Sequence, residues 1–226
     1  MDFALLPRRP VPYRDRHEAG AVLAANLIQY RDRNPIVFAL PRGGLPVADE
    51  VATALAAPLD VFVVRKLGAP GHEELAMGAI ASGGVRVLNQ ETLRWYGLSP
   101  EVVDAVASRE LQELERRERV YREGRPLLPV TGRPLLLVDD GLATGATMHA
   151  AVLAARRLTP SLIVVAVPVG ARETCEMLRG VADDVVCPLI PTSLSAVGLW
   201  YEDFSQTNDE EVREILARHT HRAAGG

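Results

Sequence analysis

The chain has 226 residues, of which 48% are hydrophobic and 24% are charged, which is the composition of one folded domain with a full hydrophobic core. Its formal net charge of −4 at pH 7 argues against nucleic acid as a partner. No apolar run approaches the ~20 residues that span a bilayer, and residues 1–16 are too rich in Arg and Pro for a secretory signal. We therefore expect a single cytoplasmic domain over residues 1–226, with no membrane partner.

Strand-like and helix-like segments alternate along the chain, in the order that builds a parallel sheet through crossover helices. In chain order, the predicted elements are a helix at 15–31, a strand at 36–40, a helix at 46–56, strands at 59–64 and 85–88, a helix at about 100–123, a strand at 135–138, a helix at 145–158, a strand at 162–167, a helix at 171–180 and a strand at 184–187. The pattern predicts a doubly wound α/β fold, with a mainly parallel sheet and helices on both faces. Residues 219–226 are predicted to be a frayed tail.

The predicted helix at about 100–123 is long and heavily charged, with only a thin apolar stripe. Its Glu and Arg residues alternate in sign, which favours a solvated helix at the edge of the domain over an arm that binds nucleic acid. We therefore treat this helix as an insertion into the single domain.

The most informative segment spans residues 135–147, Leu-Leu-Leu-Val-Asp-Asp-Gly-Leu-Ala-Thr-Gly-Ala-Thr. It joins a buried strand to a turn that opens an alanine-rich helix, and such a turn presents free N–H groups to an anion. Asp139 and Asp140 would repel a phosphate unless they accept hydrogen bonds from a neutral group, such as the vicinal hydroxyls of a ribose. The segment therefore predicts a site for ribose 5-phosphate. No Gly-Lys-Ser/Thr phosphate loop occurs in the sequence as a rival.

This segment resembles the phosphoribosyl pyrophosphate signature of the type I phosphoribosyltransferases, in which an apolar strand precedes two acids and Thr-Gly-x-Thr. The resemblance covers roughly residues 36–204. It implies an enzyme that transfers the 5-phosphoribosyl group of phosphoribosyl pyrophosphate to a nucleobase-like acceptor and releases pyrophosphate, with Mg²⁺ as cofactor. It also implies that Asp139 and Asp140 act in catalysis, by holding the ribose and stabilising an oxocarbenium-like transition state. The residues that it assigns to substrate binding in this segment are Ala143, Thr144, Gly145, Ala146 and Thr147.

A second site element, Pro41-Arg42-Gly43-Gly44, follows the first predicted strand. The glycines leave bare backbone that a ligand can approach closely, and a guanidinium fits phosphate oxygens. Taken alone, these residues are also typical of an ordinary tight turn. The resemblance implies that Arg42, Gly43 and Gly44 bind the leaving pyrophosphate, with Arg42 acting in catalysis. It further implies that the Pro41–Arg42 peptide bond is cis.

Arg65 and Lys66 close the next predicted strand, and we expect Arg65 to bind substrate and Lys66 to act in catalysis. Lys66 is the only lysine among 25 basic residues, and a compact ammonium suits a departing diphosphate. By the resemblance, residues 67–84 are the flexible loop that closes over the reacting groups. The alternative is a mobile surface loop without a role.

Three aromatic and two acidic side chains gather near the end of a segment at about residues 188–206. This arrangement resembles the hood of the purine phosphoribosyltransferases. It implies that Trp200 or Tyr201 stacks on the base and that Asp203, or Glu202, recognises it. The alternative is an aromatic cluster that seals the core.

The acceptor cannot be read from these residues. Ala143 stands where the hypoxanthine-guanine enzymes carry an Asp that handles a ring proton, so a 6-oxopurine is disfavoured, and no general base is identifiable. Two other function classes remain open, namely a non-catalytic sensor of phosphoribosyl pyrophosphate and a phosphorolytic or hydrolytic enzyme with the same ribose phosphate site. The acid pair and Lys66 favour catalysis over sensing. A homodimer is possible.

Overall fold

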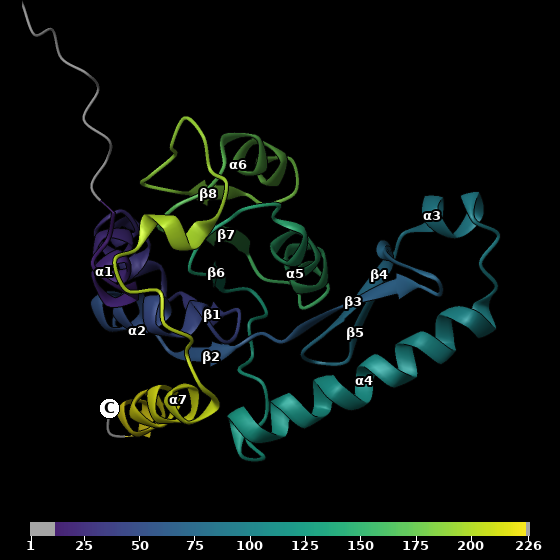
Figure 1. The fold of residues 1–226 in the computed structure, drawn as a ribbon. Coiled ribbons are helices and arrows are strands. Elements are labelled where there is room, and N and C mark those ends of the chain that lie inside the picture. Colours follow the sequence, from purple (N-terminus) through teal and green to yellow (C-terminus); the bar gives the residue numbers. More distant parts are fainter. Residues whose placement is uncertain (1–11, 225–226) are drawn as a thin grey trace, which may run out of the picture.

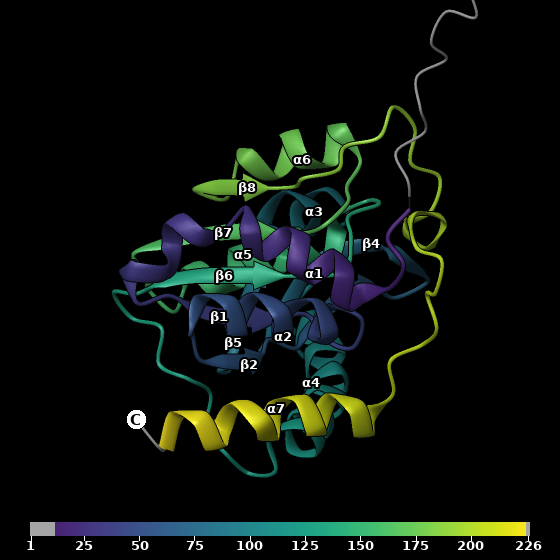
Figure 2. The ribbon, with the colours of Figure 1, turned by 90° about the vertical axis from the view of Figure 1, so that its left-hand side faces the viewer.

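The computed structural model describes residues 12–224 and centres on a five-stranded parallel sheet (Figures 1 and 2). The strand order is β2-β1-β6-β7-β8, and every pairing is parallel. The strands are β1 (Ile36–Ala39), β2 (Leu59–Val61), β6 (Pro134–Val138), β7 (Leu162–Ala166) and β8 (Asp184–Val186). Because β1 and β6 are parallel neighbours, their carboxyl ends meet at the same edge of the sheet, where ligands bind in folds of this kind.

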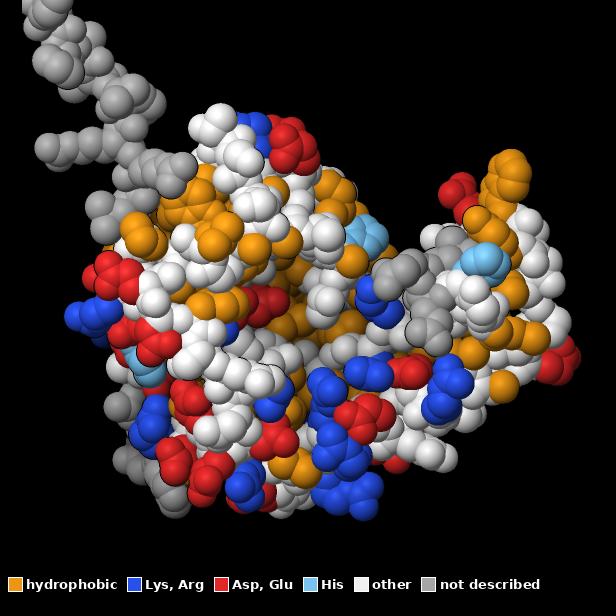
Figure 3. All heavy atoms as spheres, in the orientation of Figure 1, with side chains coloured by type: hydrophobic (Ala, Val, Ile, Leu, Met, Phe, Trp, Pro, Cys, Tyr) orange, Lys and Arg blue, Asp and Glu red, His pale blue; other side chains and the backbone are white. Residues whose placement is uncertain are grey.

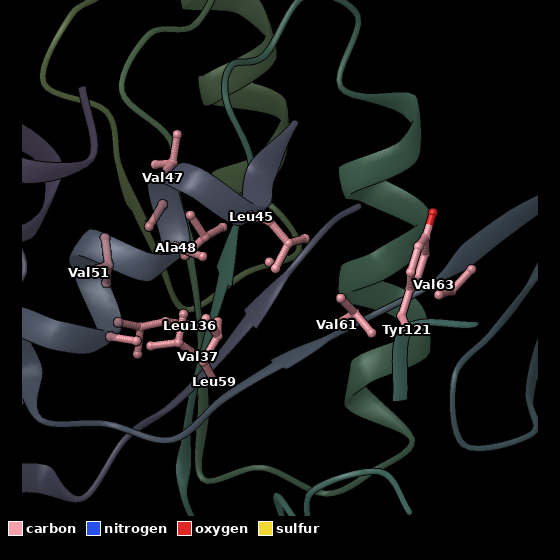
Figure 4. Packing of buried hydrophobic residues seen from close by; sticks show 14 of the residues in the cluster. Val37, Leu45, Val47, Ala48, Val51, Leu59, Val61, Val63, Tyr121 and Leu136 are labelled. Atoms are coloured by element: carbon pink, nitrogen blue, oxygen red, sulfur yellow. The ribbon is translucent and has the colours of Figure 1, made fainter. Parts of the chain in front are cut away.

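Helices cover both faces of this sheet, which confirms the predicted doubly wound α/β fold. Alternate strand residues point to opposite faces, so Val37 packs with α1, α2 and α7, whereas Phe38 packs with α5 and α6. In Figure 4, Leu45 and Val51 of α2 lie with Val37 and Leu136 of the sheet in the first of these two cores. The helices are α1 (Arg16–Ala25), α2 (Gly44–Leu55), α5 (Ala146–Arg156), α6 (Arg172–Arg179) and α7 (Asp209–Ala224), with 3₁₀ turns η1 (Ile28–Arg33) and η2 (Val197–Trp200).

The C-terminal helix α7 was not predicted. Residues 219–224 belong to it, so the expected frayed tail is wrong for these positions, and residues 225–226 lie outside the described part of the chain. The apolar residues Val212, Ile215 and Leu216 recur at helical spacing and are buried in the core. Like the other helices of residues 12–224, α7 does not have the length and apolarity needed to cross a bilayer.

Residues 64–122 form a projection from the main sheet, which we call the arm (Figure 1). Its antiparallel sheet has the order β3-β4-β5, and the long helix packs against β3. The predicted loop at 67–84 is wrong, because these residues form most of the β3–β4 hairpin. The strand predicted at 85–88 exists, but at the edge of the arm and not in the parallel sheet. The elements of the arm are β3 (Val64–Ala69), β4 (His72–Ala81), β5 (Val85–Leu88), α3 (Gln90–Trp95) and α4 (Pro100–Arg122).

A buried ion pair fastens the end of α4 to the main sheet. Arg122 Nε donates to Asp60 Oδ1 over 2.9 Å, and Arg122 Nη2 donates to the Val61 carbonyl over 2.5 Å. The Leu128 N–H donates to the other carboxylate oxygen of Asp60 over 3.1 Å. Burial raises the pKa of Asp60 and the charge of Arg122 opposes that shift. The Asp60 carboxylate therefore depends on Arg122 to remain charged inside the protein.

Candidate functional site

The two predicted acids lie directly after β6, at the carboxyl edge of the parallel sheet. The Asp140 N–H donates to Asp139 Oδ1 over 2.9 Å, and the Asp140 side chain is 15% exposed. Burial raises the pKa of both carboxyl groups, and the nearby charge of Asp140 raises the pKa of Asp139 further. Such a pair favours neutral hydrogen-bond donors, such as hydroxyl groups, over another anion.

The loop after β1 packs directly against this acid pair. A Cβ atom at Gly43 would overlap Asp140 Oδ2, and one at Gly44 would lie 2.8 Å from the Val138 carbonyl oxygen, so only glycine fits at either position. The Pro41–Arg42 peptide bond is cis, as predicted. Gly43 is the N-cap of α2. The Gly44 and Leu45 N–H groups donate to the Leu40 and Arg42 carbonyls over 3.1 Å each, and Pro46 has no N–H, so the Arg42 and Gly43 N–H groups are the backbone donors that this loop can offer a ligand.

The turn before α5 is a second helix N-terminus with a glycine as N-cap. Gly145 is its N-cap, with a φ of 70°, and a Cβ atom there would overlap Thr174 Cγ2 of α6, so both backbone and space require glycine. Thr174 Oγ1 donates to the Ala143 carbonyl over 2.5 Å and so braces the turn. Thr144 and Thr147 are exposed beside it. Free N–H groups and hydroxyls at a helix N-terminus form a site for an anion such as phosphate.

The fold brings these two glycine turns to the same place. The Leu40 N–H donates to the Val138 carbonyl over 2.9 Å, which holds the end of β1 against the end of β6. The loop at 41–44, the acid pair and the turn at 143–147 therefore meet at one edge of the sheet. Figure 3 shows that the face of the molecule is hollowed between the main sheet and the arm, with charged side chains around the hollow.

The two predicted arginines, Arg42 and Arg65, both pair with carboxylates, but Arg65 is bound more closely than Arg42. Arg42 Nη1 lies 3.8 Å from Asp209 Oδ1 at the start of α7, in a pair whose side chains are 36% and 45% exposed. Arg65 donates from Nε and Nη2 to Glu110 Oε2 of α4, over 2.9 and 2.6 Å. Glu110 thus occupies Arg65, which we expected to bind substrate. Arg42 makes a weak surface pair, and within residues 12–224 this is its one ion pair.

Lys66 is exposed on β3 and lines a cleft between the arm and α5. The cleft has a volume of about 680 Å³, and Thr144 and Ala146 of the turn at 143–147 line it as well. Lys66 belongs to the sheet of the arm, and the turn follows β6 of the main sheet. The structure therefore brings residues from two separate parts of the fold to one cavity.

The aromatic segment is only partly open. Tyr201 is buried, with 6% of it exposed, and its hydroxyl donates to the Asp140 backbone carbonyl over 2.6 Å. Tyr201 therefore belongs to the core and is not free to stack on a base, which corrects one of the two predicted roles. Trp200 is half-buried, and Phe204 is 36% exposed. Asp203 is exposed, and its carboxylate accepts a backbone N–H from two residues further on.

Arg16, which the sequence analysis did not identify, reaches the acid pair from the start of α1. Its Nε donates to Asp140 Oδ2 over 2.8 Å, and its Nη1 donates to the Ser205 carbonyl over 2.7 Å. Its guanidinium also lies 3.9 Å from the centre of the Phe204 ring. Arg16 is 124 residues from Asp140 in the chain, so no local motif could have indicated the contact.

The site offers little to a metal on its own. Within residues 12–224, no group of three or more acidic, His or Cys side chains is arranged to hold an ion. Mg²⁺ keeps several water ligands and commonly binds through substrate phosphates. The donor set is thus compatible with Mg²⁺ only if a phosphorylated ligand supplies most of the oxygens.

Comparison with known proteins identifies relatives over most of the chain. A family model for the phosphoribosyl transferase domain matches residues 14–201. Two curated proteins of Mycobacterium tuberculosis, from strains CDC 1551 and H37Rv, are provisionally named phosphoribosyl transferases. Each is 48% identical over 204 residues, which are 90% of this chain but 46% of the relative, so the chain spans about half their length. The crystal structure of the protein TT1426 from Thermus thermophilus matches with a TM-score of 0.84 and 44% identity, over 92% of this chain and 99% of that one.

Proposed function

This chain belongs to the phosphoribosyl transferase domain family, and from that premise we propose that it transfers the 5-phosphoribosyl group of phosphoribosyl pyrophosphate to a nitrogen of a nucleobase-like acceptor. Pyrophosphate is the other product. One observation carries the proposal, namely that the glycine loop after β1 and the glycine-capped N-terminus of α5 meet at a pair of half-buried acids. This arrangement suits a ligand with a phosphate at each end and a pair of hydroxyls between them. The alternative of a non-catalytic sensor finds no support among the relatives reported above.

The acid pair and the α5 turn would hold the ribose phosphate. The N–H groups and hydroxyls of residues 144–147 donate to the 5-phosphate, and Asp139 and Asp140 accept hydrogen bonds from the ribose hydroxyls. As the bond from the ribose to the diphosphate lengthens, positive charge develops on the sugar. The two carboxyl groups lie where that charge appears, and a buried setting strengthens their effect on it.

The leaving diphosphate would lie between the start of α2 and Lys66. The N–H groups of Arg42 and Gly43 would donate to the diphosphate from one side, and the ammonium of Lys66 would approach it from the arm. Arg42 joins them by leaving Asp209, which costs little because exposed pairs of this kind contribute about 0–1 kcal/mol. Arg65 stays bonded to Glu110 and orients the strand that carries Lys66. When bound, Mg²⁺ neutralises charge that builds up on the diphosphate.

The acceptor would lie beside Trp200 and Phe204, the two aromatic side chains of the segment that remain accessible. Ala143 cannot exchange a ring proton, which disfavours a 6-oxopurine. We propose a different nucleobase-like ring, presented to the ribose from the side of the sheet opposite Lys66.

A direct test uses isotope-labelled phosphoribosyl pyrophosphate, Mg²⁺ and a panel of purine and pyrimidine bases. We expect one base to form a labelled nucleoside monophosphate together with pyrophosphate. Release of ribose 5-phosphate without a base product would instead indicate a hydrolase. Tight binding without any turnover across the panel would contradict the transferase proposal and favour the sensor.

Removing the hydroxyl of Thr147 should weaken binding of the ligand. Thr147→Ala loses one hydrogen bond to a charged group, worth about 1.5–3 kcal/mol, and hence about ten- to a hundredfold in affinity. Calorimetry with phosphoribosyl pyrophosphate and Mg²⁺ measures the change. Thr131→Ala is the control, because Thr131 is an exposed residue before the amino end of β6. Equal affinities of both variants would place the phosphate elsewhere.

Truncating the accessible aromatic side chains should weaken use of the acceptor. Trp200→Ala or Phe204→Ala is expected to raise the KM for the base by an amount near one stacking contact, about 1–3 kcal/mol. Leu199→Ala is the matched control, since Leu199 is 69% exposed in the same segment. A lower melting temperature with an unchanged KM in both aromatic variants would show that these rings only seal the core.

A further inference from the structure

Arg16 makes three contacts that together join the acid pair to the aromatic segment. Its guanidinium donates to Asp140 Oδ2 over 2.8 Å and to the Ser205 carbonyl over 2.7 Å, and it lies 3.9 Å from the centre of the Phe204 ring. The Arg16 side chain is 11% exposed and that of Asp140 is 15% exposed. A guanidinium with this many fixed contacts is more than a surface counter-ion, because its geometry is set from two parts of the chain at once.

Few charged or titratable groups face Asp140, and they come from three elements. Asp139 precedes it, Arg16 reaches it from α1, and the Tyr201 hydroxyl donates to its backbone carbonyl from the aromatic segment. Burial and the Asp140 charge raise the pKa of Tyr201, so the phenol stays neutral. Arg16 is therefore the one positive charge among these groups, opposite two carboxyl groups.

Burial alone would favour neutral carboxyl groups at this edge of the sheet. It raises the pKa of Asp139 and Asp140, and Arg16 lowers the pKa of both. A protonated Asp140 would offer a donor where the ribose needs an acceptor, and it would leave the developing positive charge less stabilised. The salt bridge to Oδ2 also limits rotation of the carboxylate, so that Oδ1 remains the oxygen for a ribose hydroxyl.

We propose that Arg16 is a positioning residue that keeps Asp140 ionised and oriented for the ribose, and that couples it to the segment at 203–205 beside the acceptor. This inference rests on the proposed function. Arg16 does not contact the reacting atoms in the proposal, since it acts through Asp140. Its bond to Ser205 makes the placement of the acid depend on the placement of the aromatic segment, so the ribose and acceptor sites form together.

The test is the pH dependence of binding, measured by calorimetry with phosphoribosyl pyrophosphate and Mg²⁺ at a neutral and at a mildly acidic pH, because a raised pKa moves the protonation of a carboxyl group toward neutral pH. An opposite charge within about 4–6 Å shifts a pKa by about 1–3 units. Arg16→Met should therefore lose at least about tenfold more affinity than wild type on acidification. The ligand's own protonation affects every variant equally. Arg14→Met is the matched control, because that arginine is exposed and bonds to Asp15.

Arg16→Lys separates charge from geometry. It keeps a positive charge near Asp140, so its affinity should fall on acidification as little as that of wild type. It loses the forked contact to Ser205, and so its affinity should be lower than wild type at both pH values. This variant also gives a result if Arg16→Met fails to fold.

The outcomes distinguish this inference from the proposed function. If wild type binds phosphoribosyl pyrophosphate and Arg16→Met follows the wild-type pH dependence, Arg16 is only a structural brace and the inference is overturned. If wild type does not bind the ligand, the proposed function fails. The carboxyl-carbon NMR titration of Asp140 in the ligand-free protein then still decides the role of Arg16. Its midpoint should move up by about 1–3 units in Arg16→Met, and an unmoved midpoint refutes the inference.

Discussion

Replacing Gly145 by alanine is expected to lower the affinity for phosphoribosyl pyrophosphate about a hundredfold or more. The added Cβ atom would overlap Thr174 Cγ2, and the φ of 70° is unfavourable for alanine. The turn must then move away from α6, which disturbs the bond from Thr174 to the Ala143 carbonyl. Losing two hydrogen bonds from the turn to the charged phosphate, each worth about 1.5–3 kcal/mol, lowers the affinity about a hundredfold or more. Calorimetry in the presence of Mg²⁺ measures the loss.

Gly132→Ala is the matched control for this substitution. Gly132 has a φ of 72°, no atom lies within 4 Å of an added Cβ, and it precedes the opposite end of β6. Both variants pay about 1–2 kcal/mol for the left-handed backbone, but Gly132→Ala should bind normally. Adding Thr174→Ser to Gly145→Ala removes the methyl group, keeps the hydroxyl and should restore part of the affinity. Normal binding by Gly145→Ala would contradict the assignment of the phosphate to this turn.

Replacing Arg122 by methionine is expected to lower the free energy of unfolding by about 3–5 kcal/mol. Arg122 and Asp60 are 5% and 6% exposed. The methionine keeps most of the apolar stem but leaves the Asp60 carboxylate buried without its partner. Urea denaturation followed by circular dichroism measures the loss. Arg119→Met on the same helix is the control, because Arg119 is exposed, and its effect should stay within about 0.5 kcal/mol.

The pH dependence of this loss identifies its cause. Burial already raises the folded-state pKa of Asp60, and removing Arg122 raises it further. A carboxyl group with a raised folded pKa destabilises the fold above that pKa, and this cost disappears as the pH falls to the unfolded value of about 3.9. The deficit relative to wild type should thus be largest at neutral pH and shrink toward about pH 4. Asp60→Asn in the Arg122→Met background should recover most of it. A deficit that is constant with pH would show that packing, and not charge, was lost.

Local features of the sequence were enough to predict the parallel sheet and the centre of the site. Strands buried on both faces are continuous apolar runs, and helices between them have their own period, so β1, β6 and β7 and their neighbouring helices could be recognised from a few adjacent residues. The acid pair and the turn at 143–147 are likewise contiguous. Their geometry follows from one strand end and one helix start, which a short segment can specify. The family resemblance then related this segment to a ribose phosphate.

Long-range packing decided what the sequence alone could not. Residues 67–84 were predicted to be a loop because they contain several glycines and only short apolar stretches. They form strands because β3, β4 and α4 pack against one another and bury those stretches. Tyr201 looked like an open stacking ring, yet its neighbours in space bury it. Arg16 became part of the site only because α1 packs on α2 and brings its first turn to Asp140. The sequence by itself determined the candidate groups for phosphate and ribose, since those groups are adjacent in the chain. The tertiary structure decided their charge and their partners, because burial and ion pairing depend on residues that the fold brings together from far apart.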